Sequence, residues 1–249
     1  MAGHSKWKQI KRKKAVADAK RGAAFTKLIK EITIAARQGG GDPAGNARLR
    51  AAIDAAKAGN MPADNIERAV KKGTGELAGV VYEEATYEGF GPGGAAILLQ
   101  VTTDNLNRTV AGIRHLFSRH GGNVGGPGSV AWMFDKRGQL WLDAARTDED
   151  VALEAALEAG ADDLKRDGDQ LVITTEPAAL HAVTEALRAR GLEPRDPEIA
   201  MIPKRTVLVE GPDAEKLLRL MEAIEEHDDV SKVFSNFDID AETLAAVGG

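Results

Sequence analysis

The apolar residues of this chain change their period near residue 80, and that change limits the fold more than any other feature. Before it, apolar side chains recur at i, i+3, i+4 and i+7, the spacing of one helix face. The first stripe starts at Phe25, and Asp42-Pro43 predicts the start of the second helix. Glycines at 39–41, 59 and 73 follow the stripes. Three short helices are expected, and they predict a small N-terminal helical domain.

Beyond residue 80 the chain alternates short strands with helices. Residues 82–103 predict a hairpin closed by the glycine-rich turn 89–94, in which some glycines are expected to need positive φ. Residues 129–190 predict two strand–strand–helix units, with a turn at 135–138. A strand at 199–210, a helix and a last strand to 237 complete the chain.

Two of these segments supply too few elements to cover their own sheet faces. We therefore expect 82–120 and 196–237 to join in one two-layer domain, with another domain inserted between them; three domains in tandem are the alternative. The predicted fold is a multidomain α+β protein, with an N-terminal three-helix domain followed by two α/β two-layer domains. The expected domains are 1–78, 79–126 plus 196–240, and the inserted 127–195, followed by a tail at 241–249.

Several kinds of chemistry lack the residues that they need. The chain has no cysteine, which excludes disulfides, thiolate metal sites and cysteine nucleophiles. None of the five histidines forms an H-E-x-x-H pair. Ser129 lacks the second glycine of a nucleophile elbow, and 89–94 lacks the Lys-Ser/Thr of a phosphate loop. We expect a non-enzymatic protein with no catalytic residues, no metal, no cofactor and no small-molecule substrate.

Apolar runs are short throughout the chain. None approaches the roughly 18–20 residues of a membrane-spanning helix. The first residues lead into a basic polar stretch rather than the apolar core of a signal peptide. We expect a cytoplasmic protein that does not contact a membrane.

The charge is distributed very unevenly. The net charge is −5, but residues 1–75 carry a net +11 and residues 76–249 a net −16. A basic first third on an acidic remainder predicts a nucleic-acid contact at one end. The alternative is a solvated basic surface with no partner. The acidic part is expected to point away from nucleic acid or to meet a protein.

The basic charge is densest between positions 6 and 14. Lysines and arginines there would neutralise phosphates and release counterions, which makes binding strongly dependent on salt. Trp7 would stack on a base or pack against the helical core. Phosphate contacts carry no sequence information, so specificity would arise elsewhere. The candidate nucleic-acid-binding residues are Lys6, Trp7, Lys8, Lys11, Arg12, Lys13, Lys14, Lys20, Arg21 and Lys27.

Long motifs along essentially the whole chain resemble those of the YebC/PmpR family. Among them are Ala2-Gly3-His4-Ser5-Lys6-Trp7, Asn60-Met61-Pro62, Tyr87-Glu88-Gly89-Phe90-Gly91-Pro92-Gly93-Gly94 and Thr103-Asp104-Asn105. The resemblance implies a YebC-like fold with a helical N-terminal domain and two α/β domains. It also implies a cytoplasmic, DNA-binding transcriptional regulator. Mitochondrial relatives in this family are translational activators of cytochrome c oxidase, and bacterial members have been tied to the ribosome and to relief of stalling at proline runs.

Two main functions stay open at this point. A DNA-binding regulator would use the helical domain, but the third predicted helix, 63–72, offers few polar side chains for reading bases in a groove. A ribosome-associated translation factor would use the basic arm and Trp7 on ribosomal RNA, which suits irregular RNA. A structural adaptor that works through the acidic domains is a third alternative.

Overall fold

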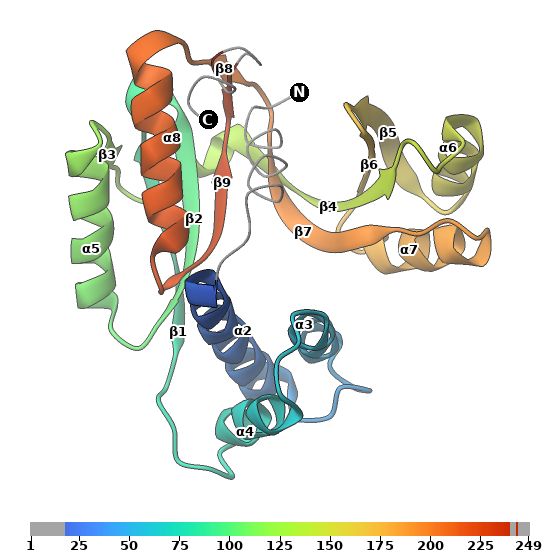
Figure 1. Cartoon of the computed structure of the whole chain (residues 1–249), viewed down its shortest axis with the longest axis horizontal. Helices are drawn as coiled ribbons and strands as arrows, with labels where there is room; N and C mark the ends of the chain where they lie inside the picture. The colour runs from blue at the N-terminus through green and yellow to red at the C-terminus, as the bar shows by residue number, and fades with distance from the viewer. Residues whose placement is uncertain (1–17, 240–242, 244–249) are drawn as a thin grey trace. The chain divides into compact units, whose positions relative to one another are not determined.

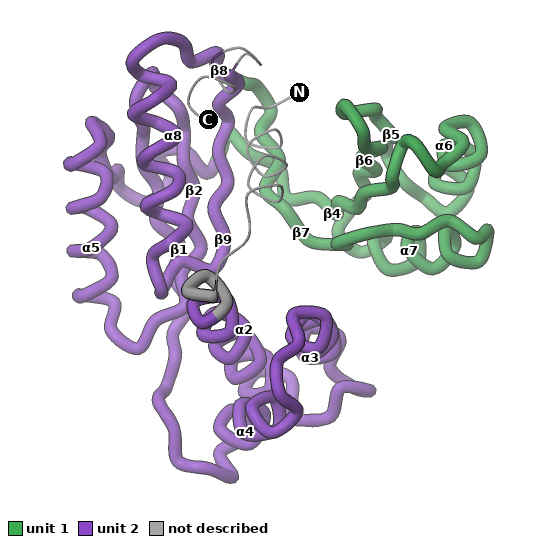
Figure 2. Tube along the Cα trace, viewed as in Figure 1, with its two compact units in different colours: residues 1–2, 132–206 green, residues 3–131, 207–249 purple. Residues whose placement is uncertain are grey.

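The computed structural model describes residues 18–239 and residue 243 (Figure 1). Residues 132–206 form one compact unit, called here the small unit (Figure 2). The other described residues, up to 131 and from 207 onward, form the large unit. The structure confirms the predicted α+β class with helices at the N-terminal end.

Three helices begin the large unit: α2 (Asp18–Gly39), α3 (Ala47–Ala58) and α4 (Ala63–Thr74), together called the helical bundle. Their apolar stripes meet in one core, which is rich in alanine and isoleucine. Small residues let the helices approach closely, since a Cβ at Gly73 of α4 would lie only 2.4 Å from the carbonyl oxygen of Thr33 in α2.

The second helix starts later than Asp42-Pro43 predicts. Asn46 is its N-cap, and its side chain accepts a hydrogen bond from the Leu49 N–H and donates to the Ala35 carbonyl. Asp42 instead accepts from the N–H of Ala44, in a local turn that precedes the helix. Asp42 thus does accept a backbone N–H, as a capping residue would, but it does so in a turn before the helix rather than at the helix start.

A four-stranded sheet follows in the large unit. Its strands are β1 (Glu83–Phe90), β2 (Ala96–Thr103), the short β3 (Asn123–Val124) and β9 (Val230–Ser235), in the order β3-β1-β2-β9. The 3-10 turn η1 (Pro92–Gly94) closes the β1–β2 hairpin. β2 and β9 pair antiparallel, from Ile97 with Ser235 onward, so segments on either side of the small unit share this sheet.

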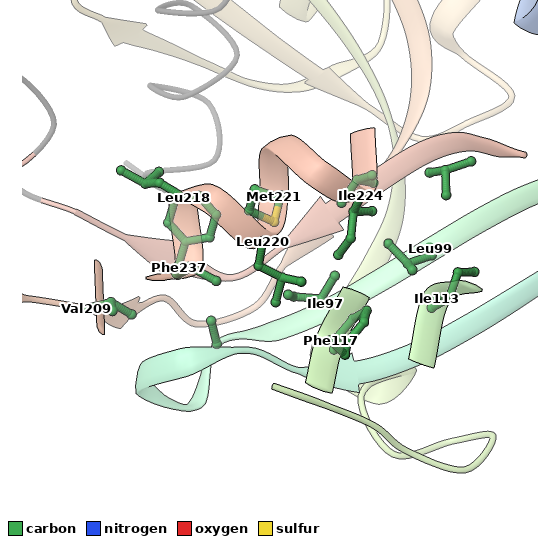
Figure 3. Packing of buried hydrophobic residues seen from close by; sticks show 14 of the residues in the cluster. Ile97, Leu99, Ile113, Phe117, Val209, Leu218, Leu220, Met221, Ile224 and Phe237 are labelled. Atoms are coloured by element: carbon green, nitrogen blue, oxygen red, sulfur yellow. The ribbon is translucent and has the colours of Figure 1, made fainter. Parts of the chain in front are cut away.

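Two helices pack on this sheet, α5 (Leu106–Arg119) and α8 (Gly211–Glu226) (Figure 1). Figure 3 shows Ile97 and Leu99 of β2 lying toward Ile113 and Phe117 of α5. Ile224 of α8 belongs to the same core. A parallel pair, β8 (Val207–Leu208) and β10 (Phe237–Asp238), completes the large unit.

The small unit has a sheet of its own, in the order β5-β6-β4-β7. Its elements are β4 (Phe134–Asp143), α6 (Glu149–Glu158), β5 (Ala161–Asp167), β6 (Gln170–Thr175), α7 (Leu180–Ala189) and β7 (Arg195–Pro203), with the 3-10 turn η2 (Ala131–Met133) before them. Leu140, Leu171 and Ile173 of the sheet are fully buried in the core with residues of α6 and α7.

The small unit differs from the sequence-based expectation in two strands. Residues 135–138 are not a turn but part of β4, because Lys136 pairs with Met201 across the sheet. Residues 195–203 form β7 on β4, so this strand belongs to the small unit rather than to the sheet that contains β9. Each of these two strands is paired with the other across a long stretch of sequence; Arg137, for example, pairs with Ala200.

A buried carboxylate anchors the segment that leads to the small unit. Glu88 of β1 accepts the N–H groups of Gly128 and Val130, both at 2.7 Å, and of Ala131 at 2.8 Å. Burial raises the pKa of Glu88, but these three hydrogen bonds lower it more, so the net pKa lies below the ordinary value. The glycine-rich segment is therefore tied to β1 at its end.

Candidate nucleic-acid interface

Most of the predicted nucleic-acid-binding residues lie outside the described part of the chain. Lys6, Trp7, Lys8, Lys11, Arg12, Lys13 and Lys14 precede its first residue, Asp18. Lys20 and Arg21 lie in the first turns of α2. Lys27 is the candidate whose side chain the structure places, and its Nζ donates to the carbonyl oxygen of Glu225 at 2.6 Å.

One turn further along α2, Lys30 is buried at 7% exposure. Its Nζ donates to Asp229 Oδ1 at 2.7 Å, to the Asp228 carbonyl at 2.9 Å and to the Thr102 carbonyl at 3.3 Å. These three acceptors match the three donors of an ammonium group. Lys30 therefore joins the helical bundle to β2 and to the segment before β9. No local sequence pattern predicted this contact.

The carboxylate that receives Lys30 is itself held in place. Asp229 Oδ2 accepts the hydroxyl of Thr109 at 2.7 Å and Arg108 Nη2 at 3.4 Å. Burial raises the pKa of Asp229, but the hydrogen bonds from Lys30 and Thr109 lower it more, to about 2. Asn105 caps α5 by accepting the Arg108 N–H. The motif 103–109 thus builds part of the ion-pair site.

The last turn of α8 and the residues after it are strongly acidic. We call residues 222–229 the acidic end of α8; it contains Glu222, Glu225, Glu226, Asp228 and Asp229. The carbonyl pole of a helix is already negative, and the last turn of α8 contains no basic residue. Lys27 and Lys30 of α2 supply positive charge there.

A second polar contact joins the bundle to the sheet. Arg48 of α3 donates to Glu31 of α2 at 2.7 Å and to Glu84 of β1 at 2.6 Å. The hydrogen bonds that Arg48 donates to both carboxylates raise its pKa above the usual range. Gln38 also donates to Glu84 at 3.0 Å. Arg48 is thus engaged within the protein and is not a free phosphate ligand.

Comparison with known proteins now identifies the family. Residues 5–76 match the TACO1/YebC protein N-terminal domain, and residues 82–237 match the TACO1/YebC second and third domain. The chain belongs to the TACO1/YebC family. The resemblance predicted from the sequence motifs is confirmed.

Relatives of this TACO1/YebC protein are named as regulators. A "Probable transcriptional regulatory protein" of Acidithiobacillus ferrooxidans (strain ATCC 53993 / BNL-5-31) is 58% identical over 98% of both chains. One from Gemmatimonas aurantiaca is 58% identical over 98% of this chain and 99% of its own. A solved structure, "Conserved Hypothetical Protein Aq1575 from Aquifex Aeolicus", has a TM-score of 0.83 at 44% identity. It covers 91% of this chain and 93% of its own.

The other lysines and arginines of the helical bundle are spread along its helices, and acidic residues offset part of their charge. Residues 22–75 contain 9 Lys and Arg against 5 Asp and Glu, whereas residues 1–21 contain 8 against 1. On α4, Lys71 pairs with Glu67 at 2.5 Å. The exposed cations of the bundle for which no ion pair is described are Arg37, Arg50, Lys57, Arg68 and Lys72.

Neither a metal centre nor a membrane span was found in the part of this family member that the structure describes. No three His, Asp or Glu side chains among residues 18–239 gather closely enough to hold a metal ion. The described helices are all too short or too polar to pass through a membrane.

Proposed function

We propose that this TACO1/YebC protein is a non-enzymatic, DNA-binding transcriptional regulator in the cytoplasm, which binds nucleic acid through its basic N-terminal segment. The relatives named as probable transcriptional regulatory proteins support a regulatory role. The observation that carries the proposal is the concentration of unbalanced positive charge in residues 1–21, beside a bundle whose central cations already have protein partners.

The proposed contact is mainly with phosphates. Lys6, Lys8 and Lys11–Lys14, with Lys20 and Arg21, would neutralise the backbone, and Trp7 would stack on a base. Lys27 already donates to the Glu225 carbonyl at 2.6 Å. It would bind nucleic acid only by exchanging this hydrogen bond for one to a phosphate. Contacts of this kind position a protein without reading sequence.

A second candidate is a ribosome-associated translation factor that binds RNA and relieves stalling. It is favoured because α4 offers few side chains for reading DNA bases. Lys71 is paired with Glu67, which leaves Arg68 and Lys72 as the other cations of this helix. A groove-reading helix usually presents several side chains to base edges. A basic segment with a tryptophan suits unstacked RNA bases instead.

A salt titration tests the proposal. The variant K11A/R12A/K13A/K14A is compared with the parent on a 20-base-pair DNA duplex and on a structured RNA of equal length. We expect weaker binding and a slope of log affinity against log salt that is shallower by roughly three to four units on the duplex. At 0.15 M salt, stronger binding of the parent to the duplex would favour the DNA-binding regulator. Stronger binding to the RNA would favour the translation factor.

A matched control removes the same charge from the bundle. The variant R37A/K57A/R68A/K72A loses four exposed cations of α2, α3 and α4. We expect its salt slope to stay close to that of the parent. Equal slopes for the parent and the first variant would show that the basic segment does not bind phosphates, and a larger change in the control would place the interface on the bundle.

A further inference from the structure

The acidic end of α8 offers the same kind of acceptors to lysine as a phosphate backbone does. It places five carboxylates within residues 222–229, at the negative pole of a 16-residue helix. Glu222, Glu226 and Asp228 are exposed. The carbonyl of Glu225 lies in the last turn, where helix carbonyls lack intrahelical partners, and Lys27 donates to it.

The cations that satisfy this acidic end come from the helix that continues the basic segment. Lys27 and Lys30 both lie on α2, and Lys30 is fully engaged and buried. Lys27 is only partly buried and is therefore the more exchangeable of the two. Residues 20 and 21 of α2 lie about 10 Å along the helix axis from Lys27, close to one Debye length at 0.1 M salt.

We propose that the acidic end of α8 competes with nucleic acid for the cations of α2 and thereby lowers the affinity of the protein for nucleic acid. Lys27 is the residue that exchanges, while the buried pair of Lys30 and Asp229 keeps the bundle in place. This inference rests on the proposed function, because the competitor must be a nucleic acid bound at the start of α2.

The first test neutralises the exposed acids and leaves the buried pair intact. The variant E222Q/E226Q/D228N is titrated with a 20-base-pair duplex and with a structured RNA at 0.1 M salt. We expect roughly fivefold tighter binding of the preferred probe than by the parent. The difference should vanish near 1 M salt, where the Debye length falls to about 3 Å.

A matched control removes three acids from the other end of the same helix. The variant E210Q/D213N/E215Q changes the net charge by the same amount, with all three residues exposed. Glu215, Asp213 and Glu210 lie 10, 12 and 15 positions before Glu225, so they are about 15–22 Å from it along the helix axis, or roughly one and a half to two Debye lengths at 0.1 M salt. Its affinity should stay within about twofold of the parent. Equal gains in the two variants would overturn the competition, since net charge would explain both.

A double-mutant cycle identifies the exchanging residue. Lys27→Ala is made in the parent and in E222Q/E226Q/D228N. In the parent, where the acidic end holds Lys27, we expect the substitution to change affinity little. In the neutralised background it should cost at least roughly threefold more than in the parent. The same factor in both backgrounds would show that Lys27 does not exchange, which contradicts the inference.

Thermal melting without nucleic acid separates a failure of this inference from a failure of the proposed function. If neither probe binds the parent, the proposed function is wrong, and the melts still test the contact. Lys27→Ala should lower the melting temperature of the parent by about 2 °C and that of the neutralised variant by less. Lys27 keeps its bond to the Glu225 carbonyl in both backgrounds. Equal losses would therefore show that the three exposed carboxylates do not help to hold Lys27, and the inference would be wrong on that ground alone.

Discussion

Lys30 and Asp229 form an ion pair at 2.7 Å, with side chains only 9% and 7% exposed, across 199 residues of sequence. The apolar core of the helical bundle and that of the large sheet share no residue among those described. The contacts described here between bundle and sheet are polar instead: this pair, Lys27 with Glu225, and Arg48 with Glu84. The position of the bundle therefore depends on charge as well as on packing.

Removing one partner of this pair should cost much more than removing both. Lys30→Met removes the buried ammonium partner of Asp229 and leaves only Arg108, at 3.4 Å, near its carboxylate. Breaking a buried ion pair in this way costs about 3–5 kcal/mol. The double variant K30M/D229N leaves no unpaired charge and should recover much of that loss. Denaturant unfolding measures the stability of both variants. Lys71→Met is the control, because its exposed ion pair with Glu67 is screened by solvent and should contribute little. Equal losses for K30M and the double variant would contradict a coupled pair.

Acid should weaken the protein through Asp229. Its pKa is lowered to about 2 in the folded state, against roughly 3.9 in an unfolded chain. A depressed pKa stabilises the fold above about pH 4, and that stabilisation is lost as the pH falls toward 2. The shift corresponds to roughly 2–3 kcal/mol. Unfolding free energies at pH 5 and pH 3 should therefore fall less in K30M/D229N than in the parent. An identical fall would assign the acid sensitivity to other carboxylates, such as Glu88.

The family, the α+β class and the helical N-terminal end could all be predicted, because local periodicity and long motifs encode them. The role of Lys30 could not be predicted from the sequence. It lies between Ile29 and Ile32 in an apolar stripe, but its acceptor is 199 residues away. The strand through 135–138 was missed for the same reason, since Asp-Lys-Arg-Gly resembles a turn until β7 pairs with it. Local signals fail where a distant partner decides the structure.

The β1–β2 hairpin should distinguish two ways in which a glycine is required. Gly93 and Gly94 have φ of 71° and 77°, whereas Gly91, at −89°, does not need the left-handed region. A Cβ on Gly94 would meet nothing within 4 Å, but one on Gly93 would lie 2.6 Å from Val209.

Gly94→Ala should therefore cost about 1–2 kcal/mol from backbone strain alone. Gly93→Ala adds a clash in a packed core and should cost about 1–3 kcal/mol more. Adding Val209→Ala should relieve part of the Gly93→Ala loss and none of the Gly94→Ala loss, as measured by thermal unfolding. If both substitutions lower stability equally, the close approach to Val209 does not matter.

The nested arrangement of domains predicts which fragments fold. The small unit, 132–206, contains all four strands of its sheet and both helices that share its core. Excised, it should show a cooperative thermal transition. A fragment cut at the expected boundaries, 127–195, retains only the first residue of β7 and exposes one side of β4, so it should melt at a lower temperature or lack a transition.

A chain of residues 1–128 lacks β9 and α8, which leaves one edge of β2 unpaired and the core around Ile97 uncovered. Amides of β1 and β2 should then exchange rapidly with solvent, while those of the helical bundle stay protected. Strong protection of β1 and β2 in that fragment would show that they fold without the C-terminal segment, and a tandem arrangement would replace the nested one.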